Sequence, residues 1–305
     1  MEILICVDDT DDLAKTTSTG KIAEAIETRL IESAAFESKG ITRHQLLLDE
    51  RIKYTSHNSA MCLALTSPEN VNDLSGRALR ELQNAIVKTG IDCVIELKAA
   101  EADPGLCVLF PEKLRHPSDL ISFGVSGQNT VLTKVQAYAL AQKERLHLSE
   151  HGGDGSGVIG AICGAGLRLS GFDGWFRGKL KPGAIGVSGR TVSARELTAK
   201  TGLPVLYEGT PLQADQQIEL KEGIKCLLMN HQKVIAVHRQ LDGEAYRPYS
   251  KKTVKNSVVL QAASCGSFEY DNDAEERMAE SPEEKSCFNC LYRRWTRHGF
   301  ECVRV

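Results

Sequence analysis

The opening of this chain constrains its fold more than any other stretch, because an apolar run leads directly into a dense group of acids. Residues 3–7 are all apolar, and four carboxylates follow within five positions, namely Asp8, Asp9, Asp11 and Asp12. Residues 20–36 then repeat apolar side chains four apart, which predicts an amphipathic helix. A strand followed by a helix places the acids at the carboxyl end of the strand, where α/β proteins bind ligands.

Closely spaced carboxylates repel one another unless a cation lies among them. Mg²⁺ is the usual partner, because it binds carboxylate oxygens and completes its shell with nucleotide phosphates and water. Four hydroxyl residues stand before the predicted helix, namely Thr16, Thr17, Ser18 and Thr19. The amides and dipole of a helix N-terminus favour a phosphate there. In the simpler alternative, an acid closes an Asx-turn and Ser18 or Thr19 caps the helix, but capping does not explain four acids.

Length and composition predict a globular protein of about two domains, since the chain has 305 residues and 42% hydrophobic content. The net charge of −3 excludes a wholly basic nucleic-acid coat, although a local basic patch can exist within that total. We see no basic leader and no apolar run near the roughly 20 residues that span a bilayer. We therefore expect a cytoplasmic location and no membrane association.

The ten cysteines do not predict a disulfide framework, because no secretory signal is evident. Most of them lie in apolar surroundings, as free buried thiols do. We expect six of them to be reduced, namely Cys6, Cys62, Cys93, Cys107, Cys163 and Cys226.

Alternating strand and helix patterns follow the opening. Residues 41–49 and 59–66 predict strands, and residues 73–90 predict a helix that ends at Gly90. Residues 92–110 are interpreted as two short strands around a turn at residues 103–105. Residues 223–240 predict a β-hairpin with its turn near Asn230. This order predicts an α+β fold, with helices on one face of the sheet.

A second candidate site segment is the glycine-rich stretch 151–166, which holds seven glycines. It predicts a loop that opens a buried helix. Gly153, Gly155 and Gly157 could direct backbone N–H groups at a phosphate, with Asp154 as a secondary magnesium ligand. Alternatively, the glycines serve turns and close packing.

Three histidines, His44, His57 and His151, have no metal-ligand spacing and are interpreted as ordinary polar or packing residues. Asn58, beside His57, could orient a nucleotide or an attacking amine.

The C-terminal stretch combines thiols with basic and aromatic residues. Cys287 and Cys290 form a CxxC pair, while Cys265 and Cys302 lie on either side. Four thiolates suit zinc, or less readily an iron–sulfur cluster; the alternative is unliganded cysteine. The interleaved arginines and aromatic rings suit RNA, although a solvated basic face has the same composition.

Several motifs together resemble one family. "VDDTDD...STG", "YTSHNSAMCLAL", "ADPGLCVLF" and "GGDGSGVIGAICGAG" are similar to segments of the archaeal tRNA(Ile) 2-agmatinylcytidine synthetase (TiaS) family, over about residues 1–240. The family carries an OB-fold and a zinc ribbon after its catalytic half, and this chain is too short for both at full size. The resemblance places Asn58 on the family's asparagine. It also places Ser18 on the family's phosphate-accepting threonine, with Thr19 as a rival.

The resemblance implies an ATP-dependent enzyme that phosphorylates a tRNA cytidine oxygen so that an amine can be attached. Asp8, Asp9 and Asp11 would hold magnesium, and Asp12, Thr17, Asn58 and the loop glycines would contact the nucleotide. We expect a kinase-like region with ferredoxin-like elements (1–195), a small β-rich region (196–262), and an acidic linker with a basic cysteine tail (263–305).

Two alternatives to this function stay open. One is an ATP-dependent kinase or ligase that acts on a small metabolite, and the other is a non-catalytic nucleotide- or RNA-binding module. The sequence does not identify the oligomeric state.

Overall fold

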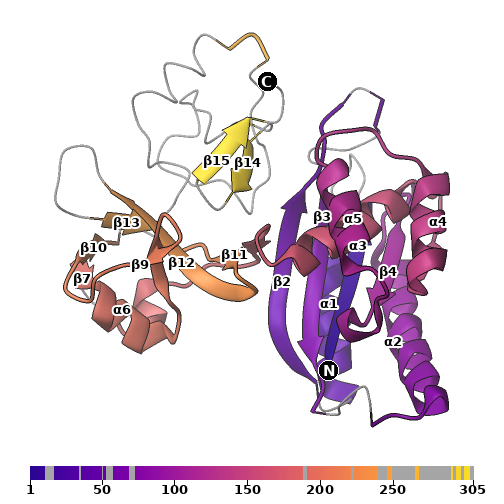
Figure 1. Cartoon of the computed structure of the whole chain (residues 1–305), viewed down its shortest axis with the longest axis horizontal. Coiled ribbons are helices and arrows are strands. Elements are labelled where there is room, and N and C mark those ends of the chain that lie inside the picture. Colours follow the sequence, from indigo (N-terminus) through magenta and orange to yellow (C-terminus); the bar gives the residue numbers. More distant parts are fainter. Residues whose placement is uncertain are drawn as a thin grey trace. The chain divides into compact units, whose positions relative to one another are not determined.

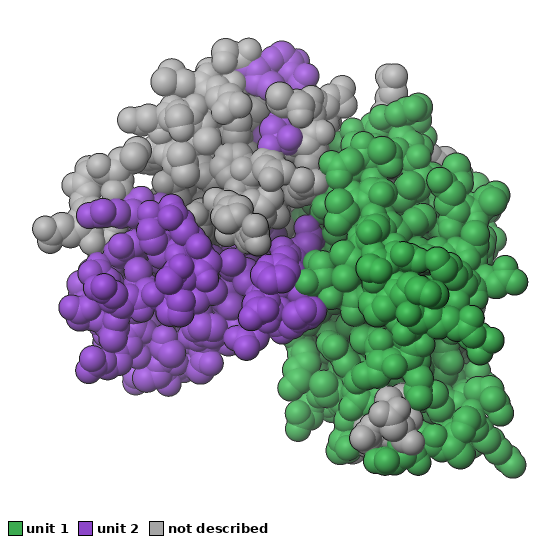
Figure 2. Space-filling model, viewed as in Figure 1, with its two compact units in different colours: residues 1–170 green, residues 171–305 purple. Residues whose placement is uncertain are grey.

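The computed structural model describes two compact units, residues 1–170 and residues 171–305 (Figures 1 and 2). The described residues are 1–10, 17–33, 36–49, 51–52, 58–68, 73–187, 191–220, 223–239, 246–248, 265–267, 290, 293–296 and 299–302. Both units mix helices with strands, which confirms the predicted α+β class. The acidic and glycine-rich segments belong to the first unit.

The first unit is built on an antiparallel sheet with strand order β5-β4-β1-β3-β2. Its strands are β1 (Glu2–Asp8), β2 (Glu37–Gln45), β3 (Ser59–Thr66), β4 (Gly105–Leu109) and β5 (His147–Glu150). The predicted apolar opening forms the central strand β1, and its residues 3–7 are at most 1% exposed. A central strand that is buried on both faces reads as a continuous apolar run, as this one does.

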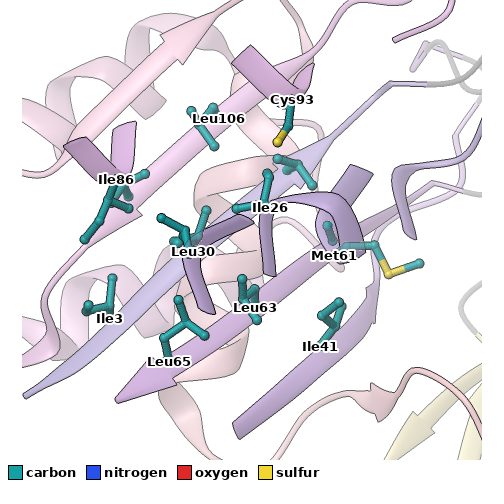
Figure 3. Close-up of a cluster of buried hydrophobic side chains, with 14 of the residues drawn as sticks. Ile3, Ile26, Leu30, Ile41, Met61, Leu63, Leu65, Ile86, Cys93 and Leu106 are labelled. Atoms are coloured by element: carbon teal, nitrogen blue, oxygen red, sulfur yellow. The ribbon is translucent and has the colours of Figure 1, made fainter. Parts of the chain in front are cut away.

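Helices cover both faces of this sheet, so the prediction of helices on one face is wrong. They are α1 (Thr19–Ser33), α2 (Gly76–Leu97), α3 (Pro117–Ser126), α4 (Lys134–Glu144) and α5 (Gly157–Ser170), and a 3₁₀ turn η1 (Pro111–Lys113) follows β4. On one face, Ile3 packs with Ile26 of α1 and Ile86 of α2 (Figure 3). On the other face, Leu4 packs with α3, α4 and α5. The unit therefore has three layers, with the sheet in the middle.

Helix α2 continues through Gly90 to Leu97, so the prediction that the helix ends at Gly90 is wrong. Gly90 is buried, and a methyl group at this position would lie 3.0 Å from Cδ2 of Leu106 in β4. The missing side chain lets the helix pack closely on the sheet, so the glycine serves packing rather than termination. We predicted two strands within residues 92–110, and the first of these predictions is wrong, because α2 continues to Leu97 and β4 is the strand that forms there.

Cys6 and Cys62 form a disulfide, so the prediction that both are free thiols is wrong. The two residues stand directly opposite each other on β1 and β3, with their Cα atoms 4.1 Å apart. The pairing depends on strand register across 56 residues of sequence. Cys93, Cys107, Cys163 and Cys226 are free and buried, as expected.

The described residues of the second unit form short strands and a small helix. Its elements are β6 (Trp175–Phe176), η2 (Pro182–Ile185), β7 (Thr191–Ser193), α6 (Ala194–Thr201), β8 (Val205–Tyr207), β9 (Thr210–Pro211), β10 (Gln217–Glu219), β11 (Leu227–Met229), β12 (Gln232–Arg239), β13 (Tyr246–Pro248), β14 (Arg293–Thr296) and β15 (Gly299–Cys302). The predicted hairpin with its turn near Asn230 is confirmed by β11 and β12. Asn230 and His231 there have φ of 49° and 59°, as a two-residue hairpin turn requires.

Across the described ranges of both units, we find no helix that combines the length and the apolar character needed to cross a membrane.

Candidate functional site

Antiparallel register brings the sequence motifs of the first unit to one edge of the sheet. Asp8 at the end of β1 pairs with Gly105 at the start of β4, and Gly105 pairs in turn with Glu150 at the end of β5. On the other side of β1, Val7 pairs with Met61, so β3 begins at the same edge. The acidic cluster, Asn58, the 103–105 turn and the glycine-rich loop therefore share this edge.

The carboxylate of Asp8 packs against a glycine of α5. Asp8 is 7% exposed, and a methyl group on Gly160 would lie 1.6 Å from its Oδ2. The carboxylate occupies the space that the missing side chain leaves. Sequence reasoning did not single out Gly160, although a glycine inside a buried helix is a signal, because glycine costs about 1 kcal/mol there relative to alanine.

Asp9 is turned toward the glycine-rich loop by an unusual backbone conformation. Its φ is 55°, in the left-handed region that Asp tolerates better than most residues. The hydroxyl of Ser156 donates to Oδ2 of Asp9 over 3.5 Å. Asp8 and Asp9 thus offer two consecutive carboxylates made only of oxygen donors, which is the chemistry that Mg²⁺ prefers. Asp11 and Asp12 lie outside the described residues.

Asp103 holds the glycine-rich loop through both its side chain and its backbone carbonyl. Its Oδ1 accepts the backbone N–H of Asp154 over 2.5 Å, and its carbonyl oxygen accepts the N–H of Gly157 over 3.0 Å. A methyl group on Gly153, where φ is 51°, would lie 1.4 Å from Oδ1 of Asp103. Gly153 is therefore needed both for its backbone conformation and for the approach of the carboxylate.

A second set of contacts to the loop comes from side chains of α4 and β5. Lys134 of α4 forms an ion pair with Glu150 at 3.0 Å and also donates to the carbonyl oxygen of Asp154. Tyr138 donates to Glu150 over 3.1 Å. The hydrogen bond from Lys134 lowers the pKa of Glu150, so this carboxylate is charged at neutral pH. A methyl group on Gly155 would lie 1.5 Å from Oε2 of Glu150.

Several amides of the glycine-rich loop already donate to acceptors in the protein. The N–H of Gly155 donates to the carbonyl of Gly152 over 3.1 Å, and that of Ser156 donates to the carboxylate of Asp154 over 2.9 Å. Gly157 donates to Asp103, as described above. That the loop glycines bind phosphate stays a prediction, and in this structure the amides of Gly155 and Gly157 already have acceptors.

The hydroxyl cluster supports the start of α1. Ser18 accepts the N–H of Lys21 with its hydroxyl over 3.3 Å and with its carbonyl over 3.0 Å, as a capping residue does. Thr10, which is fully buried, donates to the hydroxyl of Thr19 over 3.0 Å. Thr17 is half-buried beside them. A phosphate-accepting role for Ser18 or Thr19 stays a prediction.

Asn58 anchors the chain segment that follows β2. Its side-chain Nδ2 donates to the backbone carbonyl of Leu47 over 2.6 Å, and its backbone carbonyl accepts the N–H of Leu46 over 2.7 Å. A contact of Asn58 with nucleotide stays a prediction.

The histidines have polar partners. His44 is fully buried against the hydroxyl of Thr42 at 2.8 Å. The hydroxyl of Ser149 lies 2.8 Å from both His147 and His151. Burial lowers the pKa of both of these imidazoles, so both are neutral at pH 7. His57 lies outside the described residues.

Lys98 is a further site residue that sequence reasoning missed. It follows the last residue of α2, and a methyl group on Gly152 would lie 3.0 Å from its Nζ. The next residue, Ala99, donates its N–H to the carbonyl of Thr10 over 3.0 Å. The lysine therefore stands between the acidic cluster and the glycine-rich loop. Lys98 is far from both segments in the sequence, so local patterns could not predict this position.

Within the described part of the chain, one further group of side chains has the spacing of metal ligands. His116, Asp119 and Glu144 place ligand atoms within 4.8 Å of one another. However, Glu144 accepts the N–H groups of Arg115 and His116 over 2.8 Å each, and Asp119 pairs with Lys143. These bonds explain the group as a set of contacts that hold the start of α3 against α4.

In the tail, Cys265 and Cys302 are free thiols, Cys290 is buried, and Cys287 lies outside the described residues. The four-thiolate metal site stays a prediction.

Comparisons with known proteins give distant structural matches. No family model and no curated protein matches the sequence. A complex of TiaS with an isoleucine tRNA and ATP matches with a TM-score of 0.44 and 21% identity, over 57% of this chain and 38% of that chain. Apo TiaS, a tRNA agmatidine synthetase, matches with a TM-score of 0.45 and 19% identity, over 63% of this chain and 42% of that chain.

A structure described as a tRNA fluorescent labeling enzyme matches with a TM-score of 0.44 and 20% identity, over 56% of this chain and 37% of that chain. The chain thus spans about two fifths of the length of these proteins. TiaS is also the enzyme whose family the sequence motifs resemble. A likeness this distant carries no functional conclusion.

Proposed function

We propose that this chain is an ATP- and magnesium-dependent enzyme that phosphorylates an oxygen of an RNA substrate, in preparation for attachment of an amine. The observation that carries the proposal is the pair Asp8 and Asp9 at the carboxyl end of the central strand. One carboxylate packs against Gly160, and the other accepts from Ser156 just before α5. Such a pair beside a glycine-rich loop and a helix N-terminus suits a magnesium–nucleotide complex.

Phosphoryl transfer depends mainly on positioning and on electrostatic stabilisation, which suits a site built from packed glycines. Asp8 and Asp9 would hold Mg²⁺, which when bound neutralises charge on the phosphates. Asp103, Glu150 and Lys134 keep the loop in one conformation. In the transfer step, a substrate oxygen forms a bond to the terminal phosphorus while the bond to ADP breaks. An amine nitrogen then bonds to the activated carbon, and phosphate leaves with that oxygen.

The choice of a tRNA cytidine as substrate comes from the motif resemblance, and the basic aromatic tail is consistent with RNA. The tail lies largely outside the described residues. Solved TiaS complexes contain an isoleucine tRNA, ATP and agmatine, so these ligands are the first to test.

The test is transfer of label from γ-labelled ATP with magnesium, with and without bulk tRNA. The variants are Asp9→Asn and, as a matched control, Asp73→Asn, which alters an exposed aspartate before α2. Label on tRNA that Asp9→Asn abolishes and Asp73→Asn preserves supports the proposal. If ATP is consumed only with a metabolite pool, the substrate is a small molecule and the RNA part is wrong. If ATP binds and is never consumed under any condition, the chain is a binding module.

A further inference from the structure

The glycine-rich loop cannot by itself supply the positive environment that a phosphate chain needs. Loops that cradle phosphate aim successive free N–H groups at it. Here the backbone N–H groups of five residues already donate to acceptors in the loop or in the 103–105 turn, namely those of His151, Asp154, Gly155, Ser156 and Gly157. The nearby side chains are mainly carboxylates. A nucleotide at this edge therefore needs a cationic side chain in addition to magnesium.

In the described part of the chain, two lysines approach the loop, and Lys134 is the one that bonds to it. Lys134 is engaged by Glu150 and by the carbonyl of Asp154. Lys98 reaches Gly152, and among the described residues no carboxylate forms an ion pair with its ammonium. Removing Lys134 would loosen the loop, whereas Lys98 is available to a ligand.

The backbone on either side of Lys98 is fixed, so its side chain starts from a defined place. The N–H of Lys98 donates to the carbonyl of Val94 over 2.9 Å, and Ala99 is bonded to Thr10, the neighbour of Asp9. The C-terminal end of α2 carries partial negative charge, which disfavours a phosphate nearby. An ammonium at this position offsets that charge.

We propose that Lys98 binds the phosphate chain of the nucleotide and makes the site selective for di- and triphosphates over nucleosides. The inference rests on the proposed function, because it assumes that a nucleotide occupies this edge. A single charge-assisted contact of this kind contributes about ten- to one-hundred-fold in affinity. Part of that contact is screened, because Lys98 is half-buried.

The test compares equilibrium binding of ATP, ADP and adenosine, each with magnesium, to the wild type, Lys98→Ala and Lys98→Arg. Lys88→Ala is the matched control, because it removes an exposed ammonium from the same helix away from the site. Circular dichroism and thermal melts establish that each variant folds. We expect Lys98→Ala to weaken ATP by at least about tenfold, ADP less, and adenosine not at all. Lys98→Arg should recover much of the loss, and Lys88→Ala should bind as the wild type does.

The outcomes separate the inference from the function. If the wild type binds magnesium–ATP and Lys98→Ala binds it equally well, Lys98 does not contact phosphate and only the inference is overturned. If Lys98→Ala weakens ATP and adenosine alike, the role of Lys98 is structural and the inference is again wrong. If the wild type binds no nucleotide with magnesium, the proposed function itself is overturned.

Discussion

Substituting Gly160 with alanine should separate the activity of this protein from its stability. The added methyl group would lie 1.6 Å from Oδ2 of Asp8, whereas ordinary contact begins at 3.4 Å, so the carboxylate must move by about 1.8 Å. Alanine stabilises a helix by about 1 kcal/mol relative to glycine. Forcing Asp8 from its rotamer costs about 0.5–1.5 kcal/mol. The two terms nearly cancel, and we expect the free energy of unfolding to change by less than about 1 kcal/mol.

Activity should respond much more strongly to the same change. A displacement of about 1 Å in a reacting group can lower the rate about one-hundred-fold. We therefore expect Gly160→Ala to lower magnesium-dependent ATP turnover by a factor of about 100, with a raised magnesium requirement. Urea unfolding and a coupled assay for ADP release, run over a magnesium series, measure the two quantities on the same preparations.

Gly164→Ala is the control from the same helix. Its methyl group would lie 2.7 Å from Cβ of Ala60 and does not touch Asp8. Overpacking of this kind costs about 1–3 kcal/mol, which the helix gain of about 1 kcal/mol offsets only in part, so this variant should lose stability while its magnesium requirement stays normal. If Gly160→Ala keeps wild-type turnover and magnesium dependence, the fixed position of Asp8 does not matter for activity, and the argument from its packing is refuted.

Three further predictions concern the rest of the chain. Glu144→Gln should lower the free energy of unfolding at pH 7 by about 1–3 kcal/mol, because the buried carboxylate accepts the N–H groups of Arg115 and His116. Burial alone would raise the pKa of Glu144, but the hydrogen bonds from His116 and Arg115 lower it overall. The stabilisation by Glu144 should therefore be complete above the unfolded-state pKa of 4.5 and be lost as the pH falls through the lower folded-state pKa. If urea titrations give the same difference in the free energy of unfolding between the wild type and Glu144→Gln at every pH, this prediction is contradicted. Peptide mapping without reductant should recover Cys6 linked to Cys62, while Cys107 and Cys163 are alkylated only after unfolding; a free Cys62 in the native protein would contradict the pairing. Metal analysis of the purified protein should find about one zinc per chain, and Cys290→Ser should lose it while Cys226→Ser retains it; equal zinc in both variants would exclude the tail as the site.

Local patterns in the sequence were sufficient for part of this outcome. The apolar opening predicted β1, the spacing of residues 20–36 predicted α1, and the glycine-rich stretch predicted the loop before the buried helix α5. The hairpin turn at Asn230 was also predictable. Each of these depends on chemistry between near neighbours, which periodicity and turn residues record directly.

The contacts at the candidate site depend on register between distant strands. The sequence alone determined that carboxylates follow a buried strand and that a glycine-rich loop opens a helix. Only the tertiary structure decided that Asp8 packs on Gly160, that Asp103 approaches Gly153, and that Lys98 reaches the loop. It also decided that Gly90 lies within α2 and that Cys6 meets Cys62. The physical reason is that each of these depends on which atoms the antiparallel pairing and the packed helices bring within contact distance, and no spacing along the chain encodes that proximity.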